Sequence, residues 1–343
     1  MTSRCQGVLL LLGLATALAA GNAAWAQSCS GPMKKINIGV AVSPPNVVHT
    51  TPYVAKALGL FAKRCIEPNI IQFDGGNVGS IVAAIAQGDT VAQLSDIAIA
   101  QGLKGRQIWG LAPRPPQSYV VVEAIKSPAD LKGKRLSAAG GIGGFNWLMG
   151  REVLKKASLT VDDVQFISQG TAGRLPGLVA GQVDGVVLHP EDVQLAMKSK
   201  PGAHVLITLA DLVPNLAFNQ YGASDSFIAR DRSLLRDAMA AMIEANRTIY
   251  REPAKVIPAI VEATQKPKEA VEFAVAEEMK SCVWAVNEGF ERARTEWTHE
   301  NEIALGDIPK EKRLGFDQIV DMKLASEAVE AAGGRVTIGA CKD

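Results

Sequence analysis

The sequence predicts an α/β protein with two lobes, each built on a mostly parallel sheet flanked by helices. Two observations predict this fold class. Apolar runs of strand length alternate with helical periodicity over residues 36–100, and the alternation starts again over residues 135–208. A Pro-rich stretch, Ala112–Pro116, lies between the two series. Because strand–helix alternation is typical of parallel βα units, two such series indicate two sheets and therefore two lobes.

The first series supplies the first part of lobe one, residues 27–121. Its predicted elements are the strand Ile36–Val42, the helix Tyr53–Cys65, the strand Asn69–Phe73, the helix Val78–Gln87 and the strand Ser95–Ala100. The Pro-rich stretch then marks the approach to the first crossover between the lobes, and the strand Tyr119–Ala124 follows it.

The second series forms lobe two, residues 122–215. Its predicted elements are the strand Arg135–Ala139, the helix Phe145–Lys156, the strand Val164–Ile167, the helix Leu175–Ala180, the strand Gly185–Leu188, the helix Glu191–Lys198 and the strand His204–Thr208. Residues 216–343 return to lobe one, with either Asn215 or Phe218 expected at the hinge. This last part is predicted to consist of an extended segment, Tyr221–Ala229, and the helices Ser233–Arg251, Pro253–Thr264, Lys268–Ser281 and Phe316–Ala332.

Residues 1–26 have the order typical of a secretory signal peptide. One basic residue, Arg4, precedes the apolar run Val8–Ala20, and small residues lead to Ala26. The apolar run is shorter than the roughly 20 residues of a membrane-spanning helix, which favours cleavage over a membrane anchor. The sequence therefore predicts cleavage after Ala26 and a periplasmic protein.

The charge balance argues against nucleic acid as a partner. The chain has 36 Lys and Arg and 35 Asp and Glu, and removal of residues 1–26 takes away Arg4 and no acid, which leaves 35 of each. Nucleic-acid-binding proteins carry a basic excess or basic patches, whereas these Lys and Arg residues are scattered among acids.

Four cysteines remain after the predicted cleavage: Cys29, Cys65, Cys282 and Cys341. In an exported protein an even number of cysteines indicates disulfides. Three pairings are possible, and we favour Cys29 with Cys65 and Cys282 with Cys341, because each pair would tie a chain end to a nearby helical segment. A metal site is disfavoured, since CxxC spacing is absent and the chain has only 4 His. No metal or other cofactor is predicted.

Four segments carry a resemblance to a known family. They are YVAKALGLFAK at Tyr53–Lys63, GGNVGSIVAAIAQGD at Gly75–Asp89, SPADLKGKRLSAAGG at Ser127–Gly141, and the segment Ser158–Leu188, which runs from SLTVDDVQF to GLVAGQVDGVVL. In this order and at these spacings they resemble the aliphatic-sulfonate, taurine and nitrate binding proteins of ABC importers, together with the related pyrimidine-precursor binding proteins.

The resemblance implies a type II periplasmic-binding-protein fold that captures a small solute between its lobes. It also implies an ABC permease and an ATPase in the inner membrane as partners, and we expect a monomer. The chain departs from the family pattern at Cys65, where glycine is common, and in the longer connection from Gly88 to Asp96. These departures leave the ligand class open.

Candidate ligand-binding residues lie in loops at the carboxyl ends of the predicted strands, where two-lobe α/β proteins bind their ligands. They are Ser43, Asn46, His49, Gly75, Gly76 and Asn77 in lobe one, and Gly143, Gly144, Phe145, Asn146, Trp147, Thr171, Arg174, His189 and Glu191 in lobe two.

The Gly-rich loops favour an anionic ligand such as a sulfonate or a carboxylate, because bare backbone N–H groups at a helix start attract negative charge. The same glycines could instead only shape tight turns. Phe145 or Trp147 could stack on a flat, heteroaromatic ligand beside Asn146, although aromatic side chains more often pack in a core.

The charged and histidine residues of these loops also have two interpretations each. Arg174 could bind a carboxylate in a bidentate manner or remain solvated at a helix start. Glu191 could bind an amino group or only stabilise the helix N-terminus that it occupies. His49 and His189 are expected to form hydrogen bonds rather than to act as catalysts.

The sequence lacks the common signatures of catalysis. It has no GxSxG elbow, no HExxH motif, no P-loop, and no Cys–His pair in matching loops. We therefore predict a binding protein and not an enzyme. Two alternatives remain open: an enzyme of pyrimidine-precursor synthesis with the same fold, whose family carries a cysteine-rich motif that is absent here, and a periplasmic sensor without a transporter.

Overall fold

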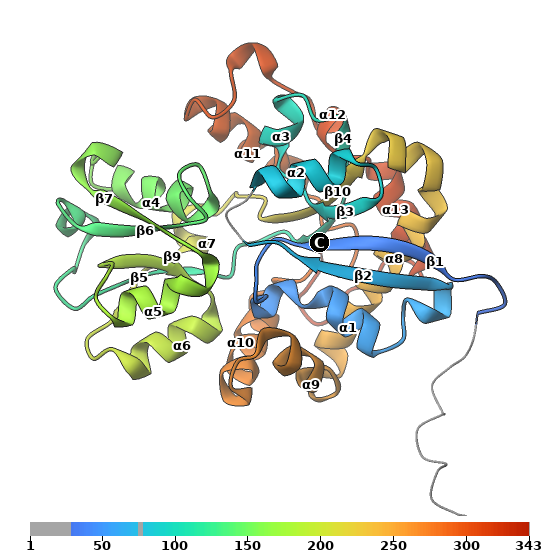
Figure 1. Cartoon of the computed structure of the whole chain (residues 1–343), viewed down its shortest axis with the longest axis horizontal. Helices are drawn as coiled ribbons and strands as arrows, with labels where there is room; N and C mark the ends of the chain where they lie inside the picture. Colours follow the sequence, from blue (N-terminus) through green and yellow to red (C-terminus); the bar gives the residue numbers. More distant parts are fainter. Residues whose placement is uncertain (1–28, 75–77, 343) are drawn as a thin grey trace, which may run out of the picture.

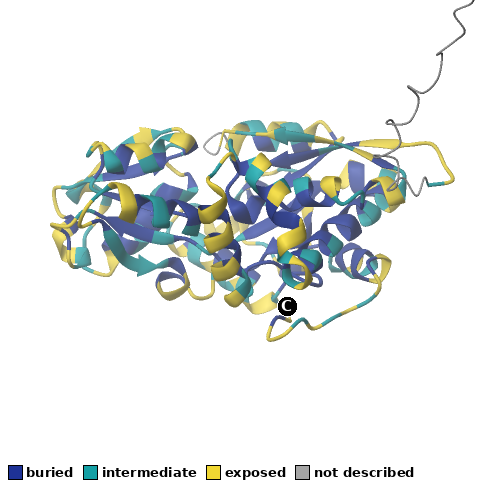
Figure 2. Cartoon of the chain, turned by 90° about the horizontal axis from the view of Figure 1, so that it is seen from below, coloured by how far each residue is buried: buried dark blue, intermediate teal, exposed yellow. Residues whose placement is uncertain are grey.

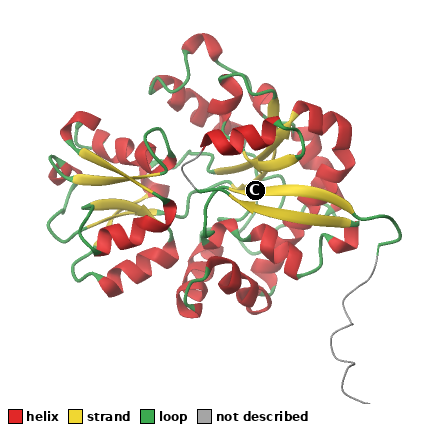
Figure 3. Cartoon of the chain, viewed as in Figure 1, coloured by secondary structure: helices red, strands yellow, loops and turns green. Residues whose placement is uncertain are grey.

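The computed structural model describes residues 29–74 and 78–342, and the predicted signal peptide lies outside them. The chain forms two five-stranded sheets, each the centre of one lobe (Figure 1). Helices cover the faces of both sheets (Figure 3). The predicted two-lobe α/β fold is therefore confirmed.

The first sheet has the strand order β2-β1-β3-β10-β4. These strands are β1 (Lys34–Val40), β2 (Ile66–Gln72), β3 (Thr90–Gln93), β4 (Gly105–Ala112) and β10 (Asn219–Ser224). β1 pairs in parallel with β2 and β3, whereas β10 lies antiparallel between β3 and β4.

The second sheet repeats this arrangement in the order β7-β6-β8-β5-β9. Its strands are β5 (Ser118–Val121), β6 (Arg135–Ala139), β7 (Gln165–Gln169), β8 (Gly185–Leu188) and β9 (His204–Thr208). β6 is parallel to β7 and β8, and β5 is antiparallel to β8 and β9. The antiparallel strands are β5, which follows the crossover from lobe one to lobe two, and β10, which follows the crossover back to lobe one. These two crossovers form the hinge.

The helices of the two lobes differ in number and length. Lobe two carries α4 (Phe145–Lys155), α5 (Arg174–Val179), α6 (Pro190–Ser199) and α7 (Leu209–Leu212). Lobe one carries α1 (Thr51–Ala57), α2 (Val78–Ala86) and α3 (Asp96–Ala100), followed after β10 by α8 (Asp225–Arg251), α9 (Pro253–Thr264), α10 (Lys268–Lys280), α11 (Arg292–Ala304), α12 (Phe316–Ile319) and α13 (Met322–Ala331). None of the helices in the described ranges combines the length and apolar character that crossing a bilayer requires.

The main hydrophobic core lies in lobe one, where α8 packs against the first sheet. Ala238, Met239 and Met242 of α8 are fully buried in the cluster that also contains Ile38 of β1 and Ile108 of β4. Lobe two has smaller apolar clusters around its own sheet. Figure 2 shows the buried residues concentrated along the two sheets. Each lobe therefore has its own apolar interior.

Several elements differ from those predicted. Residues 96–100 form helix α3 and not a strand, because Ser95 caps the helix by accepting a hydrogen bond from Ala98 N at 3.4 Å. Strands β3 and β4 were not predicted. The extended segment predicted from residue 221 ends early, because Ser224 caps α8 by accepting a hydrogen bond from Phe227 N. The second sheet begins with β5 at Ser118, ahead of the boundary predicted at residue 122.

Two disulfides join the four cysteines in the predicted pairs. Cys29 bonds to Cys65, which fixes the N-terminal segment beside the start of β2. Cys282 bonds to Cys341, which fixes the C-terminal segment just after α10. The predicted pairing is confirmed, and both bridges lie in lobe one.

Candidate functional site

A cavity of about 750 Å³ lies between the lobes. One wall comes from lobe one, from the start of α2, the segment between β3 and α3, and strands β4 and β10. The facing wall consists of residues 140–144 and helix α4 of lobe two. Residues 216–218 of the hinge and one face of α11 close the remaining sides. A molecule in this cavity would therefore contact both lobes.

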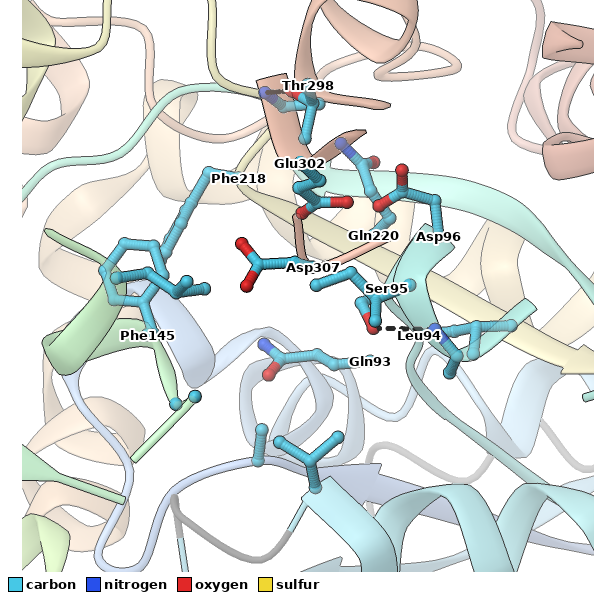
Figure 4. A pocket seen from close by; sticks show the side chains of 18 of the residues that line it. Gln93, Leu94, Ser95, Asp96, Phe145, Phe218, Gln220, Thr298, Glu302 and Asp307 are labelled. Carbon is cyan, nitrogen blue, oxygen red and sulfur yellow. Dashed lines mark hydrogen bonds between the residues drawn. The ribbon is translucent and has the colours of Figure 1, made fainter. Parts of the chain in front are cut away.

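The apolar side of the cavity is built by two aromatic rings and the first turns of α4. Phe145 of α4 and Phe218 of the hinge lie with ring centroids 5.4 Å apart. Leu148 and Met149 continue this surface along α4. Figure 4 shows Phe145 and Phe218 facing the same space as Asp307. This side suits the apolar body of a small ligand.

The polar side of the cavity is rich in hydrogen-bond acceptors. Gln107, Gln220 and Thr295 line it and are 4%, 6% and 4% exposed, yet the side-chain oxygen of each has no hydrogen-bond partner in the protein. Gln107 Nε2 donates to the carbonyl of Leu94 at 2.9 Å, which orients its Oε1 atom. Buried polar atoms without partners are rare because they cost free energy. The two glutamine oxygens are therefore poised to accept from a ligand, and the Thr295 hydroxyl can accept or donate.

Acidic side chains are the only charged groups among the described residues that line the cavity: Asp96, Glu152, Glu302 and Asp307. Asp307 pairs with Arg151 at 2.5 Å, and Glu152 pairs with Lys155 at 3.0 Å. Burial raises the pKa of Glu302 well above its ordinary value, and the negative charge of Asp96 raises it further. Glu302 therefore favours the protonated form while the cavity is empty.

Asp96, His299 and Glu302 form a buried cluster at the end of the cavity. Their potential ligand atoms lie within 4.8 Å of one another, a spacing that a metal ion could use. However, Leu314 N donates to His299 Nε2 at 2.8 Å, so the imidazole proton lies on Nδ1 and is donated to Asp96 Oδ2 at 2.7 Å. No lone pair of His299 is then directed into the cluster, and this geometry does not fit a metal site.

A second polar cluster joins the lobes on the side where α6 packs against α10 (Figure 1). We call it the interlobe bridge and define it as Asn46, Arg174, Glu191, Asp192 and Lys266. Asn46 of lobe one accepts a hydrogen bond from Arg174 NH2 and donates one to Glu191 Oε1, each at 2.7 Å. Lys266 also pairs with Asp192. Its residues are buried except for the partly exposed Lys266, and together they join the two lobes in this arrangement.

Burial also controls the ionisation of the groups at the bridge. It raises the pKa of Glu191 to about 7, with a further contribution from the charge of Asp192. Burial lowers the pKa of His49 to about 3 and that of His189 well below its ordinary value, and the Arg174 charge lowers both further. Both histidines are therefore neutral, with their rings 5.4 Å apart.

The structure separates the residues predicted to bind ligand into several groups. Gly143, Gly144 and Phe145 line the cavity. Six others lie in or beside the interlobe bridge: Asn46, His49, Thr171, Arg174, His189 and Glu191. Gly75, Gly76 and Asn77 lie outside the described residues.

Three further residues from that prediction lie near the cavity without lining it. Ser43 Oγ donates to Gln72 Oε1 at 2.9 Å. Asn146 is buried within the first turn of α4. Trp147 packs against Phe166 and lies under Arg151. Direct contact between these residues and a ligand remains a prediction.

The sequence reasoning missed the lobe-one wall and helix α11. Thr295, Thr298 and Glu302 of α11 line the cavity and follow one another at a spacing that places them on one helix face. This polar row in a C-terminal helix was the available signal. Asp96 was missed because its segment was predicted to be a strand.

The two-lobe architecture with a cavity at the hinge defines a fold shared by solute-binding proteins and some enzymes. The model of the family described as NMT1/THI5 like matches residues 46–256, and the chain belongs to this family. A search among curated proteins finds no match.

Three solved structures illustrate the similarity of the fold. The alkanesulfonate-binding protein SsuA from Xanthomonas axonopodis pv. citri, bound to MOPS, superposes with a TM-score of 0.66 and 18% identity, covering 84% of this chain and 99% of that one. The periplasmic nitrate-binding protein NrtA from Synechocystis PCC 6803 gives 0.69 and 12%, covering 87% and 89%. The desulfurization enzyme DszB gives 0.60 and 14%, covering 86% and 99%.

Proposed function

We propose that this chain is the solute-binding component of an ABC importer, which captures a small organic solute in the cavity and delivers it to a membrane permease with its ATPase. One observation carries the proposal: the cavity takes its walls from both lobes and from the hinge. The complete set of contacts exists only when the lobes are closed, so a ligand that touches both lobes stabilises the closed state by its differential affinity.

The expected cellular location agrees with this role. The leader predicted over residues 1–26 would direct the chain to the periplasm, where its two disulfides can form. There a monomer would meet solutes and dock on the permease in the inner membrane.

The cavity favours binding over catalysis. Its described lining contains no Cys, His or Lys, and its Ser95 hydroxyl caps α3. An activated nucleophile would need a neighbouring base or a lowered pKa, and the lining offers neither to Ser95. The DszB fold nevertheless makes an enzyme the relevant alternative, and a sensor without a transporter would use the same site.

The test is to identify the ligand that copurifies with the protein and to follow its effect on the lobes. Native mass spectrometry should show one small molecule per chain, unchanged in mass after long incubation. Small-angle scattering should give a smaller radius of gyration for this complex than for protein stripped by unfolding and refolding. Conversion of the molecule would identify an enzyme, and an equal radius in both states would contradict lobe closure.

A matched pair of variants locates the site. Leu148→Trp places a large side chain on the cavity wall of α4 and should abolish retention of the ligand. Met197→Trp makes the same kind of change on the surface of lobe two, where Met197 is 46% exposed, and should retain the ligand. Retention of the ligand by both variants would place the site elsewhere. Loss of retention by a folded Met197→Trp variant would also count against the cavity.

A further inference from the structure

We infer that the solute is an organic cation, with an amine or amidine head bound by Asp96 and Glu302 and an apolar body held against Phe145 and Phe218. This inference rests on the proposed function and specifies its substrate class. It differs from the anionic solute that the Gly-rich loops suggest. Helix α11, which supplies Glu302, lies outside the residues matched by the family model, so family membership does not set this wall.

The first argument is the charge of the cavity wall. Four carboxyl side chains and no Lys, Arg or His occur among the described residues that line it. Arg151 and Lys155 neutralise Asp307 and Glu152. Asp96 has only uncharged partners, His299 in the tautomer that its hydrogen bonds require and the carboxyl group of Glu302, which favours the protonated form. An uncompensated carboxylate in a partly dry cavity attracts a cation and repels an anion.

The second argument is the set of buried acceptors. Gln107, Gln220 and Thr295 are more than nine-tenths buried, line the cavity, and leave an oxygen without a partner; Glu302 Oε2 is also buried and unpartnered. Figure 4 shows Gln220 beside Glu302 and Asp96 at one end of the space. An ammonium or amidinium group carries several N–H donors and no acceptor, which complements such a wall.

The third argument is that several of the described groups suited to an anion are already engaged. In the Gly-rich loop, the N–H groups of Gly140, Gly141 and Gly144 donate to protein carbonyls at 3.0, 2.8 and 3.2 Å. Arg174 donates to Asn46 and to the carbonyl of Thr171 in the interlobe bridge. These donors are therefore not available to a sulfonate or a carboxylate in the cavity.

The opposite side of the cavity requires an apolar body on the same molecule. Phe145, Phe218, Leu148 and Met149 offer no hydrogen bonds from their side chains. An aromatic ring also attracts a cationic group that lies over its face. A cavity of about 750 Å³ with such a wall is much larger than a bare metal ion requires, in agreement with the proton position on His299.

The test compares probes of equal size and different charge. Benzylammonium, benzamidinium, benzyl alcohol, benzoate and benzenesulfonate, together with a panel of alkyl amines and diamines, are titrated by calorimetry and by thermal shift into the stripped full-length mature protein. We expect saturable binding of at least one cation and no binding of the sulfonate or the carboxylate. Binding of the anions in preference, or of no cation in the panel, would overturn the inference.

Matched variants connect the binding to the proposed groups. Asp96→Asn and Glu302→Gln should each weaken the cation about tenfold or more, the effect of removing a charge-assisted hydrogen bond. Glu300→Gln lies on the same helix but pairs with the surface residue Arg313 and should bind as the wild type does. Equal affinity in all four proteins would place the cation elsewhere and overturn the assignment.

Proton release gives a readout that a merely structural role would not change. Glu302 is surrounded by Asp96, Asp307, Arg151 and His299, and its pKa is raised in the empty cavity, so a bound cation should drive it to ionise. Calorimetry at pH 6.5 in buffers of different ionisation enthalpy should show proton release for the wild type and less for Glu302→Gln. Equal release in both would contradict the role of Glu302.

The outcomes for the solute class and for the proposed function can be distinguished. If the preferred probe is an anion that closes the lobes, the inference of a cationic solute fails and the proposed transport function stands. If a cation binds and is chemically converted, the cationic solute stands and the proposed transport function fails.

Discussion

Replacing Glu191 by glutamine should make the stability of the protein less dependent on pH. Glu191 is fully buried at the start of α6, where its Oε1 atom accepts hydrogen bonds from Asn46 Nδ2 at 2.7 Å and from Val47 N at 3.2 Å. Glutamine has nearly the same shape and keeps this acceptor oxygen. The change therefore removes the titration of the side chain while retaining its main contacts.

The size of the effect follows from the pKa of Glu191, which burial raises from 4.5 to about 7. The folded protein binds this proton more tightly than the unfolded chain, so the resulting stabilisation is fully present below pH 4.5 and is lost as the pH rises to about 7. At about 1.4 kcal/mol for each pH unit, the loss amounts to roughly 3 kcal/mol. The Glu191→Gln variant should not show this loss.

The assay is urea unfolding of both proteins, followed by circular dichroism at pH values from 4.5 to 8. The unfolding free energy of the variant minus that of the wild type should increase by about 3 kcal/mol across this range. Burial raises the pKa of Glu278 well above its ordinary value, and the charge of Glu191 raises it further. The burial of Glu278 is the same in both proteins and cancels in the difference, whereas its coupling to Glu191 contributes to the measured effect. Glu296→Gln changes a half-exposed side chain on α11 and serves as the control. A difference that stays constant with pH would refute the reasoning.

Three further predictions concern the backbone, the disulfides and the leader. Gly110→Ala should lower the free energy of unfolding by about 3 kcal/mol or more, because the new Cβ would lie 2.1 Å from the carbonyl oxygen of Gly289. Gly315→Ala is the control and should be nearly neutral in the same urea assay, since its Cβ would lie 3.6 Å from Gln318 Oε1. Reduction should raise the intact mass of the unfolded protein by about four hydrogens, two for each disulfide, and four freely alkylated thiols before reduction would contradict the bridges. N-terminal sequencing of the periplasmic protein should begin at Gln27, and a membrane-bound chain that keeps Val8–Ala20 would contradict cleavage.

Local sequence patterns predicted the strands of the second sheet, but they missed β3 and β4 of the first sheet. Most strands of the two βα series were placed correctly, because alternating apolar runs and helical periodicity report which short segments must be buried. The sequence left three disulfide pairings open, and the structure contains the favoured one. The segment Ser95–Ala100 shows where this reasoning fails, since a short apolar run has the same appearance in a strand and in a buried helix.

Only the tertiary structure decided which residues surround the cavity. Candidate loop residues such as Asn46 and Arg174 were grouped correctly at the carboxyl ends of strands, yet they meet each other in the interlobe bridge. The cavity is instead lined by Glu302 and Thr295 of α11, about two hundred residues from Asp96 in the chain. The spacing of polar residues along α11 indicates that they share one helix face, but it does not indicate what that face contacts. The contact depends on packing between segments that are far apart in the chain. The sequence thus determined the two-lobe fold class. The negative charge of the cavity was decided by the tertiary structure, because it depends on which distant segments meet there.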